Sequence, residues 1–283
     1  MIYGPDTPLY LRLFLTLKSK FVHVYSPTGA SPDQTDTMTA EDAISYIDGV
    51  QKAQEITWVD ITGGESFLYY DTMIEILTQA KKKGISGKVT TSAFWASDMS
   101  KATWVMQNLK KSGVDRLEIR YDGMYASNVE FERIKNATLA ARQKGFILQV
   151  VSNYLFPAVE GCSDKGPYVG ETSNETDRLT AELQRRLLEF LPKRCLAWER
   201  VRITDNDKKF MELLGERFAE ARDRSQKAFE SCENQNSRID TAVIVNILPN
   251  GDLEVNGRYM GNAREKEAEV MVRDFIIESR MAF

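Results

Sequence analysis

The feature that most constrains the fold is a regular alternation of helix-type and strand-type segments. Apolar residues recur at helical spacing in the first kind and form short runs in the second. In chain order the segments are Ala43–Ala53 (helix), Trp58–Thr62 (strand), Thr72–Lys83 (helix), Lys88–Ser92 (strand), Lys101–Ser112 (helix), Arg116–Tyr121 (strand), Phe131–Lys144 (helix), Phe146–Asn153 (strand), Glu175–Phe190 (helix) and Glu199–Thr204 (strand). Short glycine turns such as Lys83-Gly84 and Ser112-Gly113 end the helices. This rhythm predicts parallel β/α units, hence an α/β fold that is a partial or complete (β/α) barrel.

Polar residues and glycines follow the predicted strands. In such sheets the ligand lies at the carboxyl ends of the strands, and the residues there are Gly63, Gly64, Glu65, Ser92, Tyr121, Asp122, Gly123 and Asn153. Glycine takes positive φ without steric cost, so Gly63 and Gly64 allow backbone to approach a ligand closely. A carboxylate at Glu65 also suits the N-terminus of the helix that opens at Phe67. The two preceding glycines favour the ligand role over a simple cap.

Several motifs stand in the order in which one enzyme superfamily has them. Those motifs are its first strand (Leu13–Leu17), its cysteine loop (Phe21–Tyr25), the turn that holds the methionine amino group of S-adenosylmethionine, SAM (Thr62–Glu65), the strand that usually ends Ser-x-Asp-Gly (Leu117–Gly123), the helix after it (Phe131–Gly145), an auxiliary hairpin (Ile247–Val255) and the turn that follows (Met260–Asn262). In this ordered set the chain resembles the radical SAM superfamily, in the subgroup with a C-terminal SPASM or twitch extension. The resemblance implies a barrel domain over 1–215 and, over 216–283, a charged helix followed by a β-hairpin and helix.

The chain departs from this family at its iron site. Leu17, Phe21 and Val24 stand where the Cys-x3-Cys-x2-Cys motif would bind a [4Fe-4S] cluster, and hydrocarbon side chains do not ligate iron. Asn256 stands after Val255, where SPASM proteins often have a cysteine. We therefore expect no iron–sulfur cluster, no other metal site and no reductive cleavage of SAM. The bulky apolar replacements favour natural loss with repacking of the vacated site.

The resemblance also assigns roles in SAM binding. It places Glu65 on the amino group, and His23 beside the adenine in the loop that also carries Tyr25, although a lone histidine often serves only in packing. Ser92 and Asn153 are strand-end groups suited to the ribose.

Two further strand-end residues are the candidates for catalysis. Arg120 has a guanidinium suited to the SAM carboxylate, or to a neighbouring acid in the protein. Asp122 is the second candidate, with a turn role as its alternative. Phe94, Trp95, Tyr121 and Tyr125 line the expected mouth or pack in the ordinary way.

Composition limits the partners. The net charge of −4 and the pI near 5.4 give no electrostatic reason for nucleic-acid binding, and no apolar run is long enough to cross a bilayer. The cysteines Cys162, Cys195 and Cys232 are scattered, as in reduced cytoplasmic proteins.

Two classes of function stay open. One is an enzyme that uses SAM in polar chemistry, either group transfer or cleavage, on a small molecule or peptide. The other is a catalytically silent pseudoenzyme that binds a peptide or a true radical SAM partner. The retained Gly63-Gly64-Glu65 turn favours the first class, and the loss of cysteines at both cluster positions favours the second.

Overall fold

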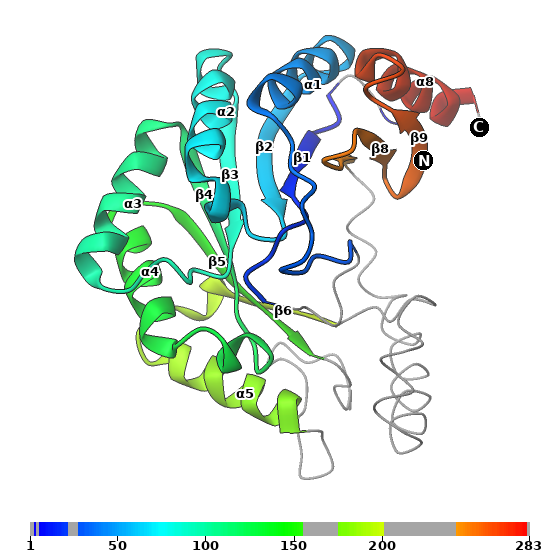
Figure 1. Ribbon diagram of the computed structural model, residues 1–283. Coiled ribbons are helices and arrows are strands. Elements are labelled where there is room, and N and C mark those ends of the chain that lie inside the picture. Colours follow the sequence, from blue (N-terminus) through cyan, green and yellow to red (C-terminus); the bar gives the residue numbers. More distant parts are fainter. Residues whose placement is uncertain (1–2, 4–5, 22–27, 155–174, 201–241, 282–283) are drawn as a thin grey trace, which may run out of the picture.

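The computed structural model describes residues 3, 6–21, 28–154, 175–200 and 242–281. Within them the strands form one sheet in the order β6-β5-β4-β3-β2-β1-β7-β8-β9 (Figure 1). The strands are β1 (Leu9–Thr16), β2 (Ile56–Gly63), β3 (Ser86–Thr91), β4 (Val114–Arg120), β5 (Ile147–Tyr154), β6 (Leu196–Arg200), β7 (Val243–Ile247), β8 (Asp252–Val255) and β9 (Arg258–Asn262). The helices are α1 (Ala40–Ala53), α2 (Tyr70–Lys82), α3 (Met99–Lys111), α4 (Phe131–Gln143), α5 (Glu175–Leu188) and α8 (Ala268–Met281), with 3-10 turns η1 (Ser66–Tyr69), η2 (Tyr125–Ser127) and η3 (Lys193–Cys195).

The barrel half of the sheet is parallel and open. Strands β1 to β6 pair in parallel with their neighbours in sequence, and helices α1 to α5 connect them and cover one face (Figure 1). In the described residues, the end strands β6 and β9 do not pair with each other. The predicted α/β fold is thus confirmed in its partial-barrel form, because the sheet does not close.

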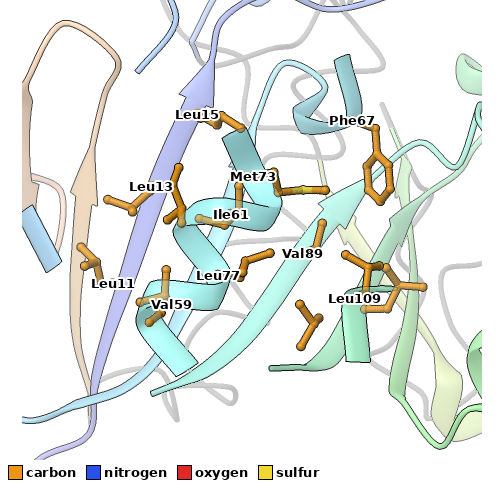
Figure 2. Close-up of a cluster of buried hydrophobic side chains, with 14 of the residues drawn as sticks. Leu11, Leu13, Leu15, Val59, Ile61, Phe67, Met73, Leu77, Val89 and Leu109 are labelled. Atoms are coloured by element: carbon orange, nitrogen blue, oxygen red, sulfur yellow. The ribbon is translucent and has the colours of Figure 1, made fainter. Parts of the chain in front are cut away.

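The two faces of the sheet differ sharply in polarity. In β1 the residues Leu9, Leu11, Leu13 and Leu15 are fully buried against the helices, while the alternating Tyr10, Arg12 and Phe14 face the concave side and stay partly exposed. Figure 2 shows Leu13, Ile61 and Val89 of the sheet beside Met73 and Leu77 of α2. Each such buried side chain contributes roughly 1.5–3 kcal/mol of hydrophobic stabilisation. The concave face is left for polar chemistry.

Local signals explain where helices begin and end. Thr39 caps α1 by accepting a hydrogen bond from the Asp42 amide, and Asp98 caps α3 through the Lys101 amide. Gly84, Gly113 and Gly145 have φ of 79°, 92° and 69° after α2, α3 and α4. The glycine turns of the sequence therefore end these helices in the left-handed conformation that glycine favours.

Two predicted elements need correction. The last barrel strand, expected at Glu199–Thr204, begins earlier, at Leu196, because η3 ends at Cys195 and pairing with β5 starts at once. Residues 201–204 of that prediction lie outside the described residues. Met260–Asn262, expected as a turn, belongs to strand β9. The turn lies earlier, at Asn256 and Gly257, whose φ of 50° and 80° are typical of a two-residue hairpin.

The C-terminal hairpin continues the barrel sheet. Strand β7 pairs in parallel with the outer edge of β1, with Leu9 opposite Val243, and β8 and β9 follow in antiparallel pairs. Helix α8 packs on α1, where Gly49 leaves room for Ala268 (Figure 1). The expected hairpin and helix are confirmed, whereas the predicted domain boundary at 215/216 and the charged helix lie outside the described residues.

Candidate functional site

The predicted site residues meet at the carboxyl edge of β2 to β5. Glu65 follows β2, Ser92 follows β3, Asp122 follows β4 and Asn153 lies near the end of β5. The parallel register brings neighbouring strand ends together, so Glu65 contacts Ser92, and Asp122 contacts Asn153. His23 and Tyr25, together with Val24, lie outside the described residues.

Glu65 is buried, at 3% exposure, and its carboxylate is surrounded by protein donors. One oxygen accepts from the Thr91 hydroxyl at 2.8 Å and the Phe67 amide at 3.4 Å. The other accepts from the Ser92 amide at 2.9 Å and from the Ser92 hydroxyl. Glu65 therefore caps η1, as one of the two sequence hypotheses proposed, and at the same time ties β2 to β3.

Burial raises the pKa of Glu65 above its ordinary value, although the hydrogen bonds from Ser92, Thr91 and Phe67 oppose that shift. Desolvation disfavours a charged carboxylate, whereas donors favour it. Here desolvation is the larger effect. Glu65 is thus a carboxyl group that takes up a proton more readily than an exposed glutamate.

Thr91 is a site residue that sequence reasoning missed. Its hydroxyl oxygen accepts from the Trp95 indole at 3.1 Å and the Ala93 amide at 3.0 Å, while the hydroxyl donates to Glu65. The chain turns here through Ala93, which has φ of 59°, a conformation that costs about 1–2 kcal/mol for a non-glycine residue. A run of hydroxyl residues at a strand end was the only available signal.

The Gly63-Gly64 turn lies directly on the loop that follows β1. A Cβ on Gly63 would stand 2.3 Å from the Thr16 carbonyl oxygen, and one on Gly64 would stand 2.1 Å from that of Lys18. The amides of Gly64 and Glu65 donate to these same carbonyls at 2.7 and 2.9 Å. Both glycines are therefore required by contact between two backbone segments, apart from any ligand.

The described part of the cysteine-loop equivalent is well packed. Leu17 exchanges backbone hydrogen bonds with Ser31 and Asp36, at 3.2 and 2.9 Å. Phe21 packs against the hydrophobic core. Two of the positions at which the resemblance expects thiolates are thus filled by half-buried hydrocarbon side chains.

Asp122 is completely buried and links three pieces of chain. One carboxylate oxygen accepts from the amides of Met124 and Tyr125, at 2.9 and 3.2 Å. The other accepts from the amide and side chain of Asn153, at 3.3 and 3.1 Å. With 0% exposure it fixes the turn after β4 to the end of β5, which matches its predicted alternative as a turn residue.

Arg120 ends a line of alternating charges across the concave face. Its Nε donates to Glu118 at 2.6 Å, Glu118 and Asp60 contact Lys88 at 2.8 and 3.0 Å, and Arg12 lies 3.5 Å from Asp60. We call this set, Arg12, Asp60, Lys88, Glu118 and Arg120, the inner-face charge network. Charged residues at alternate positions of otherwise apolar strands were the sequence signal for it.

The charges in this network reinforce one another. Burial alone would lower the pKa of Lys88, yet the carboxylates of Asp60 and Glu118 outweigh it and raise that pKa. Burial likewise opposes ionisation of Glu118, but Arg120 and Lys88 hold its pKa below the ordinary value. Lys88 and Glu118 are therefore both ionised at neutral pH.

The Tyr125 hydroxyl is influenced by several charged groups near the strand ends. Burial raises the pKa of its hydroxyl, the charges of Asp122, Glu65 and Glu118 raise it further, and Arg120 alone opposes them. The carboxylates thus outweigh the cation at this point.

Among the described residues, no cluster of His, Cys, Asp and Glu has the arrangement of a metal site. No described helix is long and apolar enough to span a membrane.

Comparisons with known proteins identify the fold. No protein-family model and no curated protein matches the sequence. Among solved structures, anSMEcpe with bound AdoMet (SAM) matches with a TM-score of 0.55 at 10% identity, covering 98% of this chain and 82% of that one. Its complex with AdoMet and the Cp18Cys peptide gives 0.53 at 12%, covering 96% and 83%.

A third structure, methylornithine synthase (PylB), matches with a TM-score of 0.50 at 13% identity, covering 99% of this chain and 83% of that one. At identities this low, the structural matches show a shared architecture only. The chemistry has to be inferred from the residues of the site. The matches run over nearly the whole chain, including the C-terminal hairpin. The chain therefore has the open (β/α) fold of the radical SAM type.

Proposed function

We propose that the protein binds SAM at the carboxyl ends of β2 to β5, holds no iron–sulfur cluster, and uses SAM in polar rather than radical chemistry. The observation that carries the proposal is that two buried carboxylates, Glu65 and Asp122, stand at this edge, at 3% and 0% exposure. Asp122, Glu65 and Glu118 outweigh Arg120 at the Tyr125 hydroxyl. SAM carries an ammonium and a sulfonium against one carboxylate, so its net positive charge suits this edge.

The residues present fit a SAM amino group after one local change. All acceptor positions of Glu65 are taken, but two of its donors are the hydroxyls of Thr91 and Ser92. A hydroxyl rotates and also accepts hydrogen bonds, unlike an amide N–H. An ammonium would therefore replace one hydroxyl donor on Glu65, while the amides of Ser92 and Phe67 stay in place.

The residues do not fit a [4Fe-4S] cluster. Leu17, Phe21 and Val24 stand at the three positions of the cluster motif and offer no thiolate. Phe21 instead adds to the hydrophobic core. Iron and sulfide assays after anaerobic reconstitution test this part, and a stoichiometric cluster would refute it.

SAM supplies an electrophilic carbon next to its sulfonium, and attack on such a carbon depends chiefly on positioning. In this proposal Ser92 and Asn153 contact the ribose, and Arg120 orients the SAM carboxylate or the nucleophile. Asp122 acts by fixing Asn153, since its four protein donors leave its carboxylate no free position.

Calorimetric titration of SAM and S-adenosylhomocysteine into the protein tests binding. We expect Glu65→Gln to weaken SAM by about tenfold or more, because an ammonium–carboxylate hydrogen bond is lost. Glu75→Gln, on the surface of α2, is the matched control and should bind as the parent does. Absence of SAM binding by the folded parent refutes the proposal, and equal affinity in Glu65→Gln removes Glu65 from the site.

Mass spectrometry after incubation with SAM and cell extract tests the chemistry. Methylthioadenosine or S-adenosylhomocysteine, formed without reductant and lost in Arg120→Ala, is the expected result. Reductant-dependent 5'-deoxyadenosine would mean radical cleavage and refute the proposal.

A second candidate is a pseudoenzyme that binds a peptide or a radical SAM partner. It is favoured by the pairing of both proposed catalytic groups inside the protein, Asp122 with four donors and Arg120 with Glu118. One structure of the same fold contains a bound peptide, Cp18Cys. This candidate predicts that SAM stays intact with every extract fraction while a partner co-purifies with the protein.

A further inference from the structure

The concave face below the strand ends carries a charged row of its own, which is connected to the acidic edge through Glu118 and Arg120. In register, Arg12 of β1 lies between Asn246 of β7 and Asp60 of β2, and Asp60 lies beside Lys88 of β3. All four side chains therefore stand in one row on the concave face. This row crosses the seam at which the C-terminal hairpin joins the barrel.

The inner-face charge network has cations at both ends. Arg12, Lys88 and Arg120 alternate with the two carboxylates Asp60 and Glu118, so positive charge exceeds negative charge by one. Asp60 and Glu118 are each shared by two cations and are 3% and 6% exposed. A net positive network in a partly buried site favours an anion more strongly than the same charges on an exposed surface.

Arg12 is the open end of the network. Its contact with Asp60 is made through Nε at 3.5 Å, and 40% of its side chain is exposed. Among the described residues, no hydrogen bond reaches its two terminal nitrogens, which are the ones that grip an oxyanion in a fork.

Asn246, the neighbour of Arg12 on β7, has one unsatisfied acceptor. Its side-chain oxygen is buried without a hydrogen bond in the described part of the chain. Buried polar atoms normally have a partner, so a bound molecule with a donor group would satisfy it. Glu254 of β8 stands opposite Asn246 in register, one strand spacing from Asn246 and two from Arg12, so its carboxylate borders the row on the β8 side.

An aromatic floor closes the row on the amino-terminal side. Tyr10 and Trp58 stack at 3.7 Å between ring centroids, and the Arg116 guanidinium covers Trp58 at 4.5 Å. A ligand that enters from the strand ends would therefore meet the charged row before this floor.

We propose that the concave face binds the oxyanion of a small molecule, a carboxylate or phosphate, in the fork of Arg12, with Lys88 next in the row and Asn246 accepting a hydrogen bond from the same ligand. The site lies deeper than the acidic edge, so a cationic SAM and an anionic substrate would occupy successive layers. The oxyanion site does not depend on SAM and is tested without it.

The probes are 2-hydroxyglutarate, whose hydroxyl supplies a donor for Asn246, and inorganic phosphate, both at constant ionic strength, and binding is followed by the indole N–H resonances of the ¹⁵N-labelled protein. We expect saturable shifts of Trp58, which borders the row, and none of Trp104, which is 49% exposed on α3. A Trp58→Phe variant assigns the resonance. A response to one probe alone identifies the carboxylate or the phosphate class.

Arg12→Gln should weaken binding of the effective probe by about tenfold or more, since a charge-assisted pair is lost. Arg273→Gln changes the net charge equally on the outer surface of α8, where Arg273 pairs with Glu269, and should bind as the parent does. The site is refuted if the folded parent gives no saturable Trp58 shift, or if Arg12→Gln and Arg273→Gln bind alike. The Trp58 shift is measured on the parent, so it decides the matter even where Arg12→Gln folds poorly.

Discussion

The carboxylate of Glu65, just after β2, accepts hydrogen bonds from both the backbone amide and the hydroxyl of Ser92, just after β3. This one relationship joins two residues predicted for the same site and shows how the site is built. Both oxygens of the Glu65 carboxylate already accept two hydrogen bonds each from donors within the protein. Any ligand at this edge must therefore exchange with an existing hydrogen bond.

The contact between Gly64 and Lys18 predicts a large steric effect. Alanine at Gly64 would place its Cβ 2.1 Å from the Lys18 carbonyl oxygen, which belongs to hydrogen-bonded backbone. We expect Gly64→Ala to lower the free energy of unfolding by about 3 kcal/mol, measured by urea denaturation.

Gly84→Ala is the comparison for this variant. Gly84 has φ of +79° and nothing within 4 Å of an added Cβ, so only its backbone conformation opposes the change. A cost of about 1–2 kcal/mol is expected there. Equal effects at Gly64 and Gly84 would contradict the close contact with Lys18.

The raised pKa of Glu65 predicts a specific pH dependence of stability. Because the folded-state pKa lies above the ordinary value of 4.5, its contribution is fully present below pH 4.5 and is lost as pH rises through the folded-state pKa. Glu65→Gln does not titrate, so the stability difference between parent and variant should shift in that window. If thermal melts show that the stability of the parent and of Glu65→Gln depends on pH in the same way, the pKa of Glu65 is not raised in the folded protein.

We expect the main role of the Asp122 carboxylate to be stabilisation of the fold, because its oxygens accept hydrogen bonds within the protein. Asparagine replaces one acceptor oxygen by a donor group, which leaves amides of Met124 and Tyr125, or of Asn153, without their acceptor. We expect Asp122→Asn to cost about 2–3 kcal/mol in denaturant unfolding. Asp115→Asn, at a 57% exposed side chain in β4, the strand that precedes Asp122, should cost less than about 1 kcal/mol.

If instead Asp122→Asn is as stable as the parent but inactive, the carboxylate has a direct chemical role. That result would restore the catalytic assignment of Asp122. It would also require one of its four hydrogen bonds to open when the ligand binds.

Lys88→Met should destabilise the protein by about 3–5 kcal/mol, because it leaves two buried carboxylates with one cation fewer. Glu118 has a folded-state pKa below 4.5, so its contribution is present above pH 4.5 and is lost as pH falls. The difference in the free energy of unfolding between the parent and Lys88→Met should therefore become smaller at acidic pH. Lys83→Met, which breaks a half-exposed pair with Asp48, should cost less than about 1 kcal/mol. If Lys88→Met and Lys83→Met lower the free energy of unfolding equally, the inner-face charge network adds little to stability.

The sequence by itself determined the order of elements and the edge at which polar groups gather. Alternating periodicity and glycine stops such as Gly84 and Gly145 are local signals, and a parallel sheet necessarily collects its strand ends at one edge. For that reason Glu65, Ser92, Asp122 and Asn153 could be grouped from their positions along the chain. The absence of thiolates at Leu17, Phe21 and Val24 is likewise a fact of sequence alone.

Only the tertiary structure decided what those groups contact. That Glu65 reaches Thr91 and Ser92 depends on the turn at Ala93, and that Gly64 touches Lys18 depends on how two backbone segments meet in space. The inner-face charge network joins Arg12 to Arg120 across strands far apart in sequence, through a register that no local pattern fixes. Pairing of β7 with β1 is equally non-local, because 226 residues separate the last residue of β1 from the first residue of β7. Contacts of this kind follow from three-dimensional packing, and so sequence periodicity is silent about them.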